Sequence, residues 1–396
     1  MRRYFPGLLL VMTLPAAADE RFTGPWPMDE LKRAPASSVS EPDPATGLRE
    51  VFYENVPLDG KPARVFAYYA VPRTGEGPFP AMVLVHGGGG KAFPEWARLW
   101  ADRGYAAIAM DLSGRGPDGE RLPDGGPDQS DEEKFRDFEP EEVGRMWSYH
   151  AVAAAVRAHS FLAARPEVDR DRIGVTGISW GGYLTCIVAG IDDRVKVAVP
   201  VYGCGFLDEN SAWIPRFEEM GEARTRRWCD LFDPSRYLPG VSCPILFVNG
   251  TNDFAYPLDS YRKSYRLVEG PVDLCITVGM LHGHPQGWAP EEIGLFVESI
   301  LEGGTPPPRL TAPEIDGGSG RISARVASNR SYGKAKLHYT TDSGAWQERS
   351  WSTIDAEIGD SRVEAELPRE RPIVAFFTVE DDRGAVASSP HVTAGK

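Results

Sequence analysis

Gly-Ile-Ser-Trp-Gly, at residues 177–181, is the stretch that decides the fold of this chain. It follows a mostly apolar run at residues 172–176 and opens into residues 182–189, which can form a helix. Glycines around a serine at a strand-to-helix turn allow a sharp bend that lifts the hydroxyl clear of the sheet, where it can act as a nucleophile. Ser179 could instead only cap the helix, and these five residues alone leave both roles open.

A cluster of glycines follows an earlier predicted strand. Residues 80–85 are apolar and predict a buried strand, and His-Gly-Gly-Gly-Gly follows at residues 86–90, a segment that we call the glycine loop. Glycines let the backbone turn its amides toward a substrate oxygen without a Cβ in the way. We expect three backbone amides to form an oxyanion hole: those of Gly88, Gly89 and Trp180. His86 is expected to tie the loop down, because a catalytic base should come much later in the chain.

An acid and two histidines come after the serine in the chain. A predicted strand at residues 244–250 leads to Asp253, whose carboxylate can accept a hydrogen bond from a histidine and fix its tautomer. The next predicted strand, residues 272–278, leads to a loop that carries His282 and His284. Proline follows His284 and restricts its backbone toward extended conformations, so we expect His284 to line the pocket and His282 to be the base.

Strands alternate with helices from about residue 50 to residue 302, which predicts a mostly parallel central sheet with helices on both faces. Two antiparallel strands are expected at one edge, and a long helix from about residue 143 to residue 164. Residues 19–49 are rich in Pro, Ser and Ala and are expected to extend over the surface. Two insertions, about residues 113–142 and 203–235, lie above the carboxyl ends of strands, where substrates bind.

Aromatic residues gather in the second insertion, among charged residues. Aromatic rings can stack on the faces of sugar rings, but a lid also needs apolar side chains to pack on the body of the protein. For any one of these residues, packing is the more common role. The residues that we expect to line a substrate pocket are Tyr202, Trp213, Trp228 and His284.

A Pro-rich linker at residues 305–308 ends the helical pattern. Residues 306–396 hold short alternating strands with turns between them, which predicts a small immunoglobulin-like β-sandwich. This part of the chain has no matched nucleophile and base. Few contacts need to cross such a linker, so we expect a separate domain that does no chemistry.

Composition and the N-terminus predict export. Residues 1–18 combine a basic start, an apolar run and small residues before a cleavage site, as a signal peptide does, so we expect a secreted or periplasmic protein. The net charge of −14 argues against nucleic acid as a partner. No later segment approaches the length of a membrane span. The five cysteines are not spaced like a zinc site, and Cys204 and Cys229 could form a disulfide. We expect no metal and no organic cofactor.

The motifs at residues 177–183, 86–90 and 249–253 resemble those of the acetyl-xylan-esterase-like hydrolases, related to the prolyl-oligopeptidase and dienelactone-hydrolase branches of the α/β-hydrolase superfamily. The resemblance covers about residues 50–302. It implies an α/β-hydrolase fold, whose catalytic residues come in the order serine, acid, histidine. In related enzymes the catalytic histidine precedes a glycine or small residue, as His282 does here.

The resemblance also implies a secreted serine carboxylesterase that removes acetyl or similar small acyl groups from carbohydrate. The partner would be an acylated carbohydrate or another small ester, and Ser179, Asp253 and His282 would form the catalytic triad. Dienelactone hydrolases proper carry a cysteine where Ser179 stands. Two alternatives stay open: a prolyl-oligopeptidase-like peptidase, and a glycan-binding protein on a catalytically silent hydrolase fold.

Overall fold

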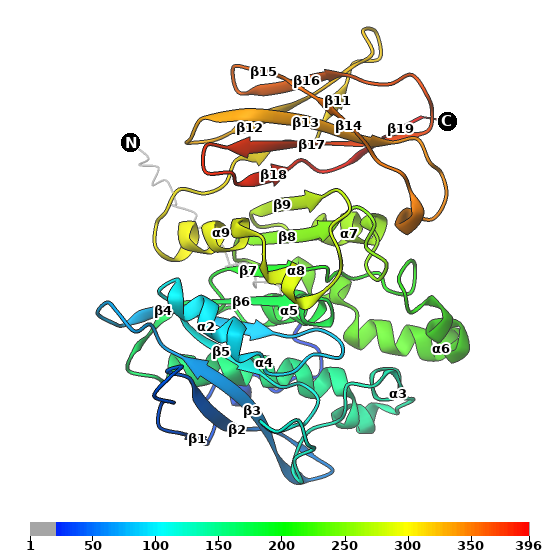
Figure 1. Cartoon of the computed structure of the whole chain (residues 1–396). Helices are drawn as coiled ribbons and strands as arrows, with labels where there is room; N and C mark the ends of the chain where they lie inside the picture. Colours follow the sequence, from blue (N-terminus) through cyan, green and yellow to red (C-terminus); the bar gives the residue numbers. More distant parts are fainter. Residues whose placement is uncertain (1–20, 396) are drawn as a thin grey trace, which may run out of the picture.

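The computed structural model describes residues 21–395. The signal peptide expected at residues 1–18 therefore lies outside the described residues. A nine-stranded sheet runs through the part of the chain before the Pro-rich linker, in the order β1-β2-β3-β5-β4-β6-β7-β8-β9 (Figure 1). Three antiparallel strands form one side of it: β1 (Ser37–Val39), β2 (Arg49–Leu58) and β3 (Lys61–Ala70).

The other six strands pair in parallel, and β3 joins them through an antiparallel pairing with β5. The central parallel strands β4, β5, β7 and β8 are almost wholly buried, as the near-continuous apolar runs predict. The sheet is therefore mixed and its larger part is parallel. The parallel strands are β4 (Phe79–Val85), β5 (Ala106–Met110), β6 (Val168–Ile178), β7 (Ala198–Val201), β8 (Ile245–Gly250) and β9 (Val272–Thr277).

Helices connect these strands and pack on the sheet, which confirms the α/β class. The helices before and after β6, α4 and α5, lie against each other and are buried over nearly their whole length. Their small and apolar residues allow this close packing. The connecting helices are α2 (Pro94–Asp102), α4 (Trp147–Ala163), α5 (Trp180–Ile191), α7 (Leu258–Tyr265), α8 (His284–Trp288) and α9 (Glu291–Leu301).

Helix α4 begins about four residues later than the pattern predicts. Residues Pro140–Arg145 form a separate 3-10 turn, η1, and Met146 is extended with φ −72° and ψ 136°. The apolar spacing continues across this break, so it could not reveal the start of the helix. The segment expected only to extend over the surface also differs: it contains α1 (Met28–Leu31), and it buries Trp26 and Leu31 in the main core.

Each insertion has some helical structure of its own. The first contains α3 (Asp131–Lys134) and η1, and the second contains α6 (Ile214–Phe232). Helix α6 is kinked at Gly221, where φ is +71°, so its apolar residues show no single helical period. Two short 3-10 turns, η2 (Pro234–Arg236) and η3 (Leu238–Gly240), return the chain to β8. None of the helices within residues 21–395 combines the length and the apolar character that a membrane crossing needs.

The C-terminal part consists of two five-stranded antiparallel sheets, consistent with a β-sandwich. Their inner faces share one apolar cluster that includes Ile322, Leu337 and Phe377. One sheet holds β10 (Arg309–Leu310), β11 (Glu314–Ile315), β12 (Arg321–Ala327), β15 (Glu357–Gly359) and β16 (Arg362–Glu366). The other holds β13 (Tyr332–Thr340), β14 (Ser352–Asp355), β17 (Ile373–Asp381), β18 (Val386–Ser388) and β19 (Val392–Ala394).

The expectation that few contacts cross the linker is wrong. Figure 1 shows β18 beside β9, and the Ser388 hydroxyl accepts a hydrogen bond from the amide of Ile276 at 2.8 Å. Phe376 of the sandwich belongs to the main hydrophobic core, and Arg309 pairs with Asp273 of β9 at 2.5 Å. Because apolar and polar contacts both join the two parts, they form a packed interface.

Candidate active site

Ser179 occupies the turn between β6 and α5 with φ 58° and ψ −117°. A positive φ at a residue other than glycine costs about 1–3 kcal/mol and persists only where the surroundings impose it. Here the Ser179 amide donates to the carbonyl of Val201 at 2.8 Å, and a Cβ on Gly181 would overlap the carbonyl oxygen of Val85. Close packing of backbone on backbone therefore imposes the turn, and it presents the serine at the carboxyl end of β6.

Asp253 and His282 lie together at the ends of the two last strands. The Nδ1 of His282 is 2.6 Å from Oδ2 of Asp253. The other carboxylate oxygen accepts the amides of Ala255 and Tyr256 at 2.9 and 2.7 Å. Because a carboxylate only accepts, the proton resides on Nδ1 and Nε2 remains available as a proton acceptor. The Asp253 side chain has no exposed surface, so these three hydrogen bonds replace its water.

Aromatic rings hold the imidazole of His282 on two sides. Tyr202 stacks on it with ring centres 4.4 Å apart, and Phe254 lies at 4.8 Å. The Tyr202 hydroxyl donates to the carbonyl of Leu281 at 2.8 Å, which fixes the residue just before the histidine. Tyr202, predicted to line a pocket, thus supports the histidine, whereas Phe254 was not anticipated because nothing distinguishes it from a loop residue.

His284 has a different environment from His282. Its Nε2 accepts the amide of Gly87 at 3.0 Å, and its ring lies 4.8 Å from that of Phe93. Burial lowers the pKa of His284 to about 4, with smaller contributions from the neighbouring rings of His86 and His282. A neutral ring whose Nε2 already accepts a hydrogen bond fastens the glycine loop, and this arrangement favours His282 over His284 as the base.

The glycine loop packs directly on the turn at Ser179. A Cβ on Gly87 would lie 2.9 Å from the Cβ of Ser179, so only glycine fits there. Within residues 21–395, the amides of Gly88, Gly89 and Trp180 have no protein acceptor and are free to bind an oxyanion. Gly89 has φ +65°, a conformation that glycine adopts without strain.

His86 is buried beneath this loop. Its Nδ1–H donates to the carbonyl of Gly87 at 2.7 Å, and its Nε2 accepts the amide of Leu112 at 2.9 Å. Burial lowers the pKa of His86 to about 4, so the ring is neutral. This arrangement is the loop-fastening role expected from the sequence.

The indole of Trp180 lies within an aromatic cluster formed by both insertions. Trp213 is half-buried, with its ring centre 4.4 Å from that of Trp180, whereas Trp228 has no exposed surface and donates to the carbonyl of Lys134 at 2.8 Å. The prediction that Trp228 lines a pocket is therefore wrong, because its side chain packs inside the second insertion, residues 203–235. The Lys134 ammonium, 4.8 Å from the Trp180 ring, was missed, since one lysine in a polar insertion carries no signal.

The disulfide that Cys204 and Cys229 could have formed is absent, and all five cysteines are free thiols. Cys204 is buried beside Cys186 and Ser264, whereas the Cys229 sulfur lies within 4.8 Å of the carboxylates of Asp208 and Asp233. The carboxylate of Asp233 already accepts three backbone amides, those of Phe206, Leu207 and Ser235. These bonds give Asp233 a structural role within the second insertion.

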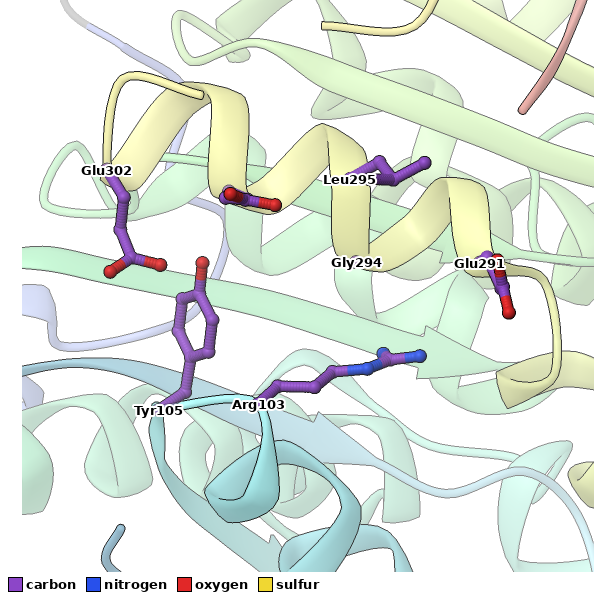
Figure 2. A pocket seen from close by; sticks show the side chains of 7 residues that line it. Arg103, Tyr105, Glu291, Gly294, Leu295 and Glu302 are labelled. Atoms are coloured by element: carbon purple, nitrogen blue, oxygen red, sulfur yellow. The ribbon is translucent and has the colours of Figure 1, made fainter. Parts of the chain in front are cut away.

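A separate surface pocket lies between the start of β5 and α9 (Figure 2). Tyr105 and Arg103 come just before β5, whereas Ser179, Asp253 and His282 follow the carboxyl ends of their strands. The pocket therefore opens at the opposite end of the parallel strands and contains none of the predicted site residues. It is lined by Arg103, Tyr105, Glu291, Gly294, Leu295, Glu298 and Glu302.

Comparisons with known proteins agree with this geometry. The sequence profile of the family described as "Acetyl xylan esterase (AXE1)" matches residues 44–213, which include the glycine loop and Ser179 and end before Asp253. An acetyl esterase, Axe7A, of Xylanibacter ruminicola is 23% identical over 275 residues, or 63% of this chain. The match covers 60% of that protein, so this chain spans less than two thirds of its curated relative.

Solved structures of acetyl xylan esterases share the fold. The enzyme from Paenibacillus sp. R4 superposes with a TM-score of 0.56 at 23% identity, over 69% of this chain and 92% of its own. The enzyme from Thermoanaerobacterium sp. JW/SL YS485 gives 0.55 at 19% identity, over 70% and 96%. The sheet and the strained turn at Ser179 agree with this fold, and with the profile match over residues 44–213 they make the chain similar to the acetyl-xylan-esterase-like α/β hydrolases.

Proposed function

We propose that this chain is an exported serine carboxylesterase that removes acetyl or similar small acyl groups from carbohydrate. The observation that carries the proposal is the buried hydrogen bond of 2.6 Å between Asp253 and His282, at the same end of the sheet as the strained turn of Ser179. A serine in a strained turn, a buried acid and a histidine whose Nε2 is free are the three groups that an acyl-transfer site uses. The profile match supports an ester as substrate.

The proposed reaction proceeds through an acyl-enzyme. Ser179 Oγ attacks the ester carbonyl while His282 Nε2 takes its proton, and the carboxylate of Asp253 stabilises the imidazolium. The imidazolium then protonates the leaving sugar hydroxyl. Water, deprotonated by the same histidine, attacks the acyl-enzyme and releases acetate and the serine hydroxyl. The amides of Gly88, Gly89 and Trp180 hold the oxyanion in both steps, at about 3 kcal/mol for each donor.

The surroundings of His282 favour a small acyl group on an amphipathic alcohol. Phe254, whose ring contacts His282, and Leu281, the residue before His282, are 58% and 70% exposed. Exposed apolar side chains beside a catalytic group can contact an acyl methyl or the apolar face of a sugar ring. The net charge of −14 disfavours polyanionic substrates.

Turnover of defined substrates tests the proposal. Acetate release from acetylated xylo-oligosaccharides should exceed methanol release from methyl uronates, and peptide amides should stay intact. Ser179→Ala should lose nearly all turnover while it keeps the melting temperature of the wild type. Wild-type-like hydrolysis by the variant, or faster cleavage of amides than of acetyl esters, would contradict the proposal. N-terminal sequencing of the protein recovered outside the cytoplasm tests export and cleavage after residue 18.

A further inference from the structure

The loop that carries Asp253 is bonded to the β-sandwich. Asn252, the residue before the acid, donates its Nδ2 hydrogens to the carbonyls of Gln347 and Arg349, at 3.1 and 2.8 Å. Both carbonyls belong to the sandwich, in and just after the 3-10 turn η4 (Trp346–Glu348). Because carbonyls only accept hydrogen bonds, the amide nitrogen of Asn252 must face them.

The remaining polar atom of Asn252 joins the loop of the histidine. Asn252 Oδ1 accepts the hydroxyl of Thr251 at 2.7 Å, and the oxygen of that hydroxyl accepts the amide of Gly279 at 3.0 Å. Gly279 lies three residues before His282 in the loop after β9. One amide side chain therefore links three segments: the acid loop, the histidine loop and the sandwich.

The sandwich loop is itself well fixed, as a positioning element must be. The Arg349 guanidinium lies over the Trp346 ring at 3.7 Å and donates to the carbonyl of Gly344 at 3.0 Å. The amide of Ser350 donates to the carboxylate of Asp342 at 2.7 Å. Trp346 also packs on the main core of the molecule.

We infer that Asn252 is a positioning residue, through which the β-sandwich sets the distance between Asp253 and His282. The sandwich thereby becomes part of the active-site scaffold although none of its side chains takes part in the chemistry. This inference rests on the proposed function for the roles of Asp253 and His282. A displacement of about 1 Å in a catalytic group can cost about a hundredfold in rate, so a link of this kind has measurable consequences.

The test uses the full chain with Asn252→Ala, Asn252→Asp and a matched control, Ser388→Ala. Ser388 also makes an interface hydrogen bond, to the amide of Ile276 at 2.8 Å, but touches neither the acid loop nor His282. We expect Asn252→Ala to lower kcat by about tenfold to a hundredfold with KM within about twofold. Asn252→Asp should lower kcat further, because the aspartate keeps the shape of the asparagine side chain but places a carboxylate against two carbonyl oxygens. Ser388→Ala should lower only the melting temperature.

The pH profile separates positioning from stability. A carboxylate that moves away stabilises the imidazolium less, so the acidic limb of kcat/KM in Asn252→Ala should move to lower pH. The low-field proton resonance of His282 Nδ1–H should shift in the same variant, a readout that needs no turnover. A wild-type kcat, pH profile and resonance in Asn252→Ala would overturn the inference. Absence of ester turnover in the wild type would instead contradict the proposed function, and the resonance would still decide the role of Asn252.

Discussion

The two halves of the proposed active site are held in different ways. The nucleophile half, Ser179 with the glycine loop, is fixed by backbone contacts inside the sheet, where glycines allow the close approach. The acid–base half, Asp253 with His282, follows the last two strands and is held mainly by side chains, including Tyr202 and Asn252. The first half depends on glycines, because their lack of a Cβ allows the backbone segments to approach closely. The second half depends on particular side chains that hold Asp253 and His282 in place. Substitutions should therefore affect the two halves differently.

The largest effect on stability is expected when a methyl group is added to a glycine in the nucleophile half. In Gly181→Ala the new Cβ would overlap the carbonyl oxygen of Val85, and the backbone on both sides is buried. We expect a loss of more than about 4 kcal/mol in the free energy of unfolding, or no folded protein, measured by urea denaturation. Gly144→Ala is the control, since a Cβ there meets no atom within 4 Å. Equal stability of the two variants would remove the contrast between the halves.

The two histidines offer the next largest effect. His282→Ala should lower kcat by about a thousandfold, within the usual range for loss of a general base. It should also lower the melting temperature, because Oδ2 of the buried Asp253 loses its partner. His284→Ala leaves the Gly87 amide without its acceptor, so it should cost about 1–3 kcal/mol of stability and less than about tenfold in kcat. If His284→Ala were the inactive variant and His282→Ala kept most of its turnover, the assignment of the base would be reversed.

Buried histidines predict how stability depends on pH. A histidine in the unfolded chain has a pKa of about 6.5, so between pH 6.5 and 4 the unfolded chain binds more protons than the folded one. The free energy of unfolding should therefore fall as the pH is lowered across this window, by at least about 1.4 kcal/mol per pH unit, the value for one proton. Burial lowers the pKa of five histidines to about 4 and that of a sixth, His391, to about 3; the five are His86, His150, His159, His284 and His338.

Urea denaturation at several pH values measures this slope, with turnover followed in parallel at the same values. A flat or opposite slope between pH 6.5 and 4 would contradict the prediction. The parallel measurement sharpens the comparison because the proposed reaction requires His282 to accept a proton. The lowered pKa values of the buried histidines, two of them in or against the glycine loop, instead contribute to the pH dependence of unfolding.

The smallest effect is expected at Tyr202. Tyr202→Phe keeps the ring that stacks on His282 and removes only the hydrogen bond to the carbonyl of Leu281. One such bond contributes about 0.5–1.5 kcal/mol, so kcat should fall by less than about tenfold. Turnover and melting temperature are measured beside Tyr202→Ala, which also removes the ring and should lose more. Equal losses in the two variants would show that the ring itself does not support the imidazole.

The sequence predicted best those features that are encoded by adjacent residues. A serine between glycines after a strand predicted the turn at Ser179, and the glycine loop predicted free amides above it. The proximity of Asp253 and His282 also followed, since both come directly after parallel strands, whose carboxyl ends meet at one edge of a sheet.

Features that depend on tertiary contacts were not predictable in this way. The burial of Trp228, the free state of Cys204 and the link from Asn252 to the sandwich each depend on segments far apart in the chain. A Pro-rich linker indicates a locally stiff chain but does not indicate which segments pack together on either side of it. The expectation of few contacts between the β-sandwich and the rest of the chain was therefore wrong. The start of α4 was misplaced because an apolar period continues through a 3-10 turn.

The position of β18 beside β9 has a consequence for the behaviour of the protein in concentrated solution. Strand β9 ends the nine-stranded sheet, and an uncovered edge of this kind invites other chains to add as further strands and aggregate. The Ser388 hydroxyl accepts the amide of Ile276 and donates to its carbonyl, so it occupies polar groups that a foreign strand would use. The opposite edge ends in the three-residue strand β1, too short to offer a long template. The sandwich thus also acts as the cover that keeps the sheet from growing.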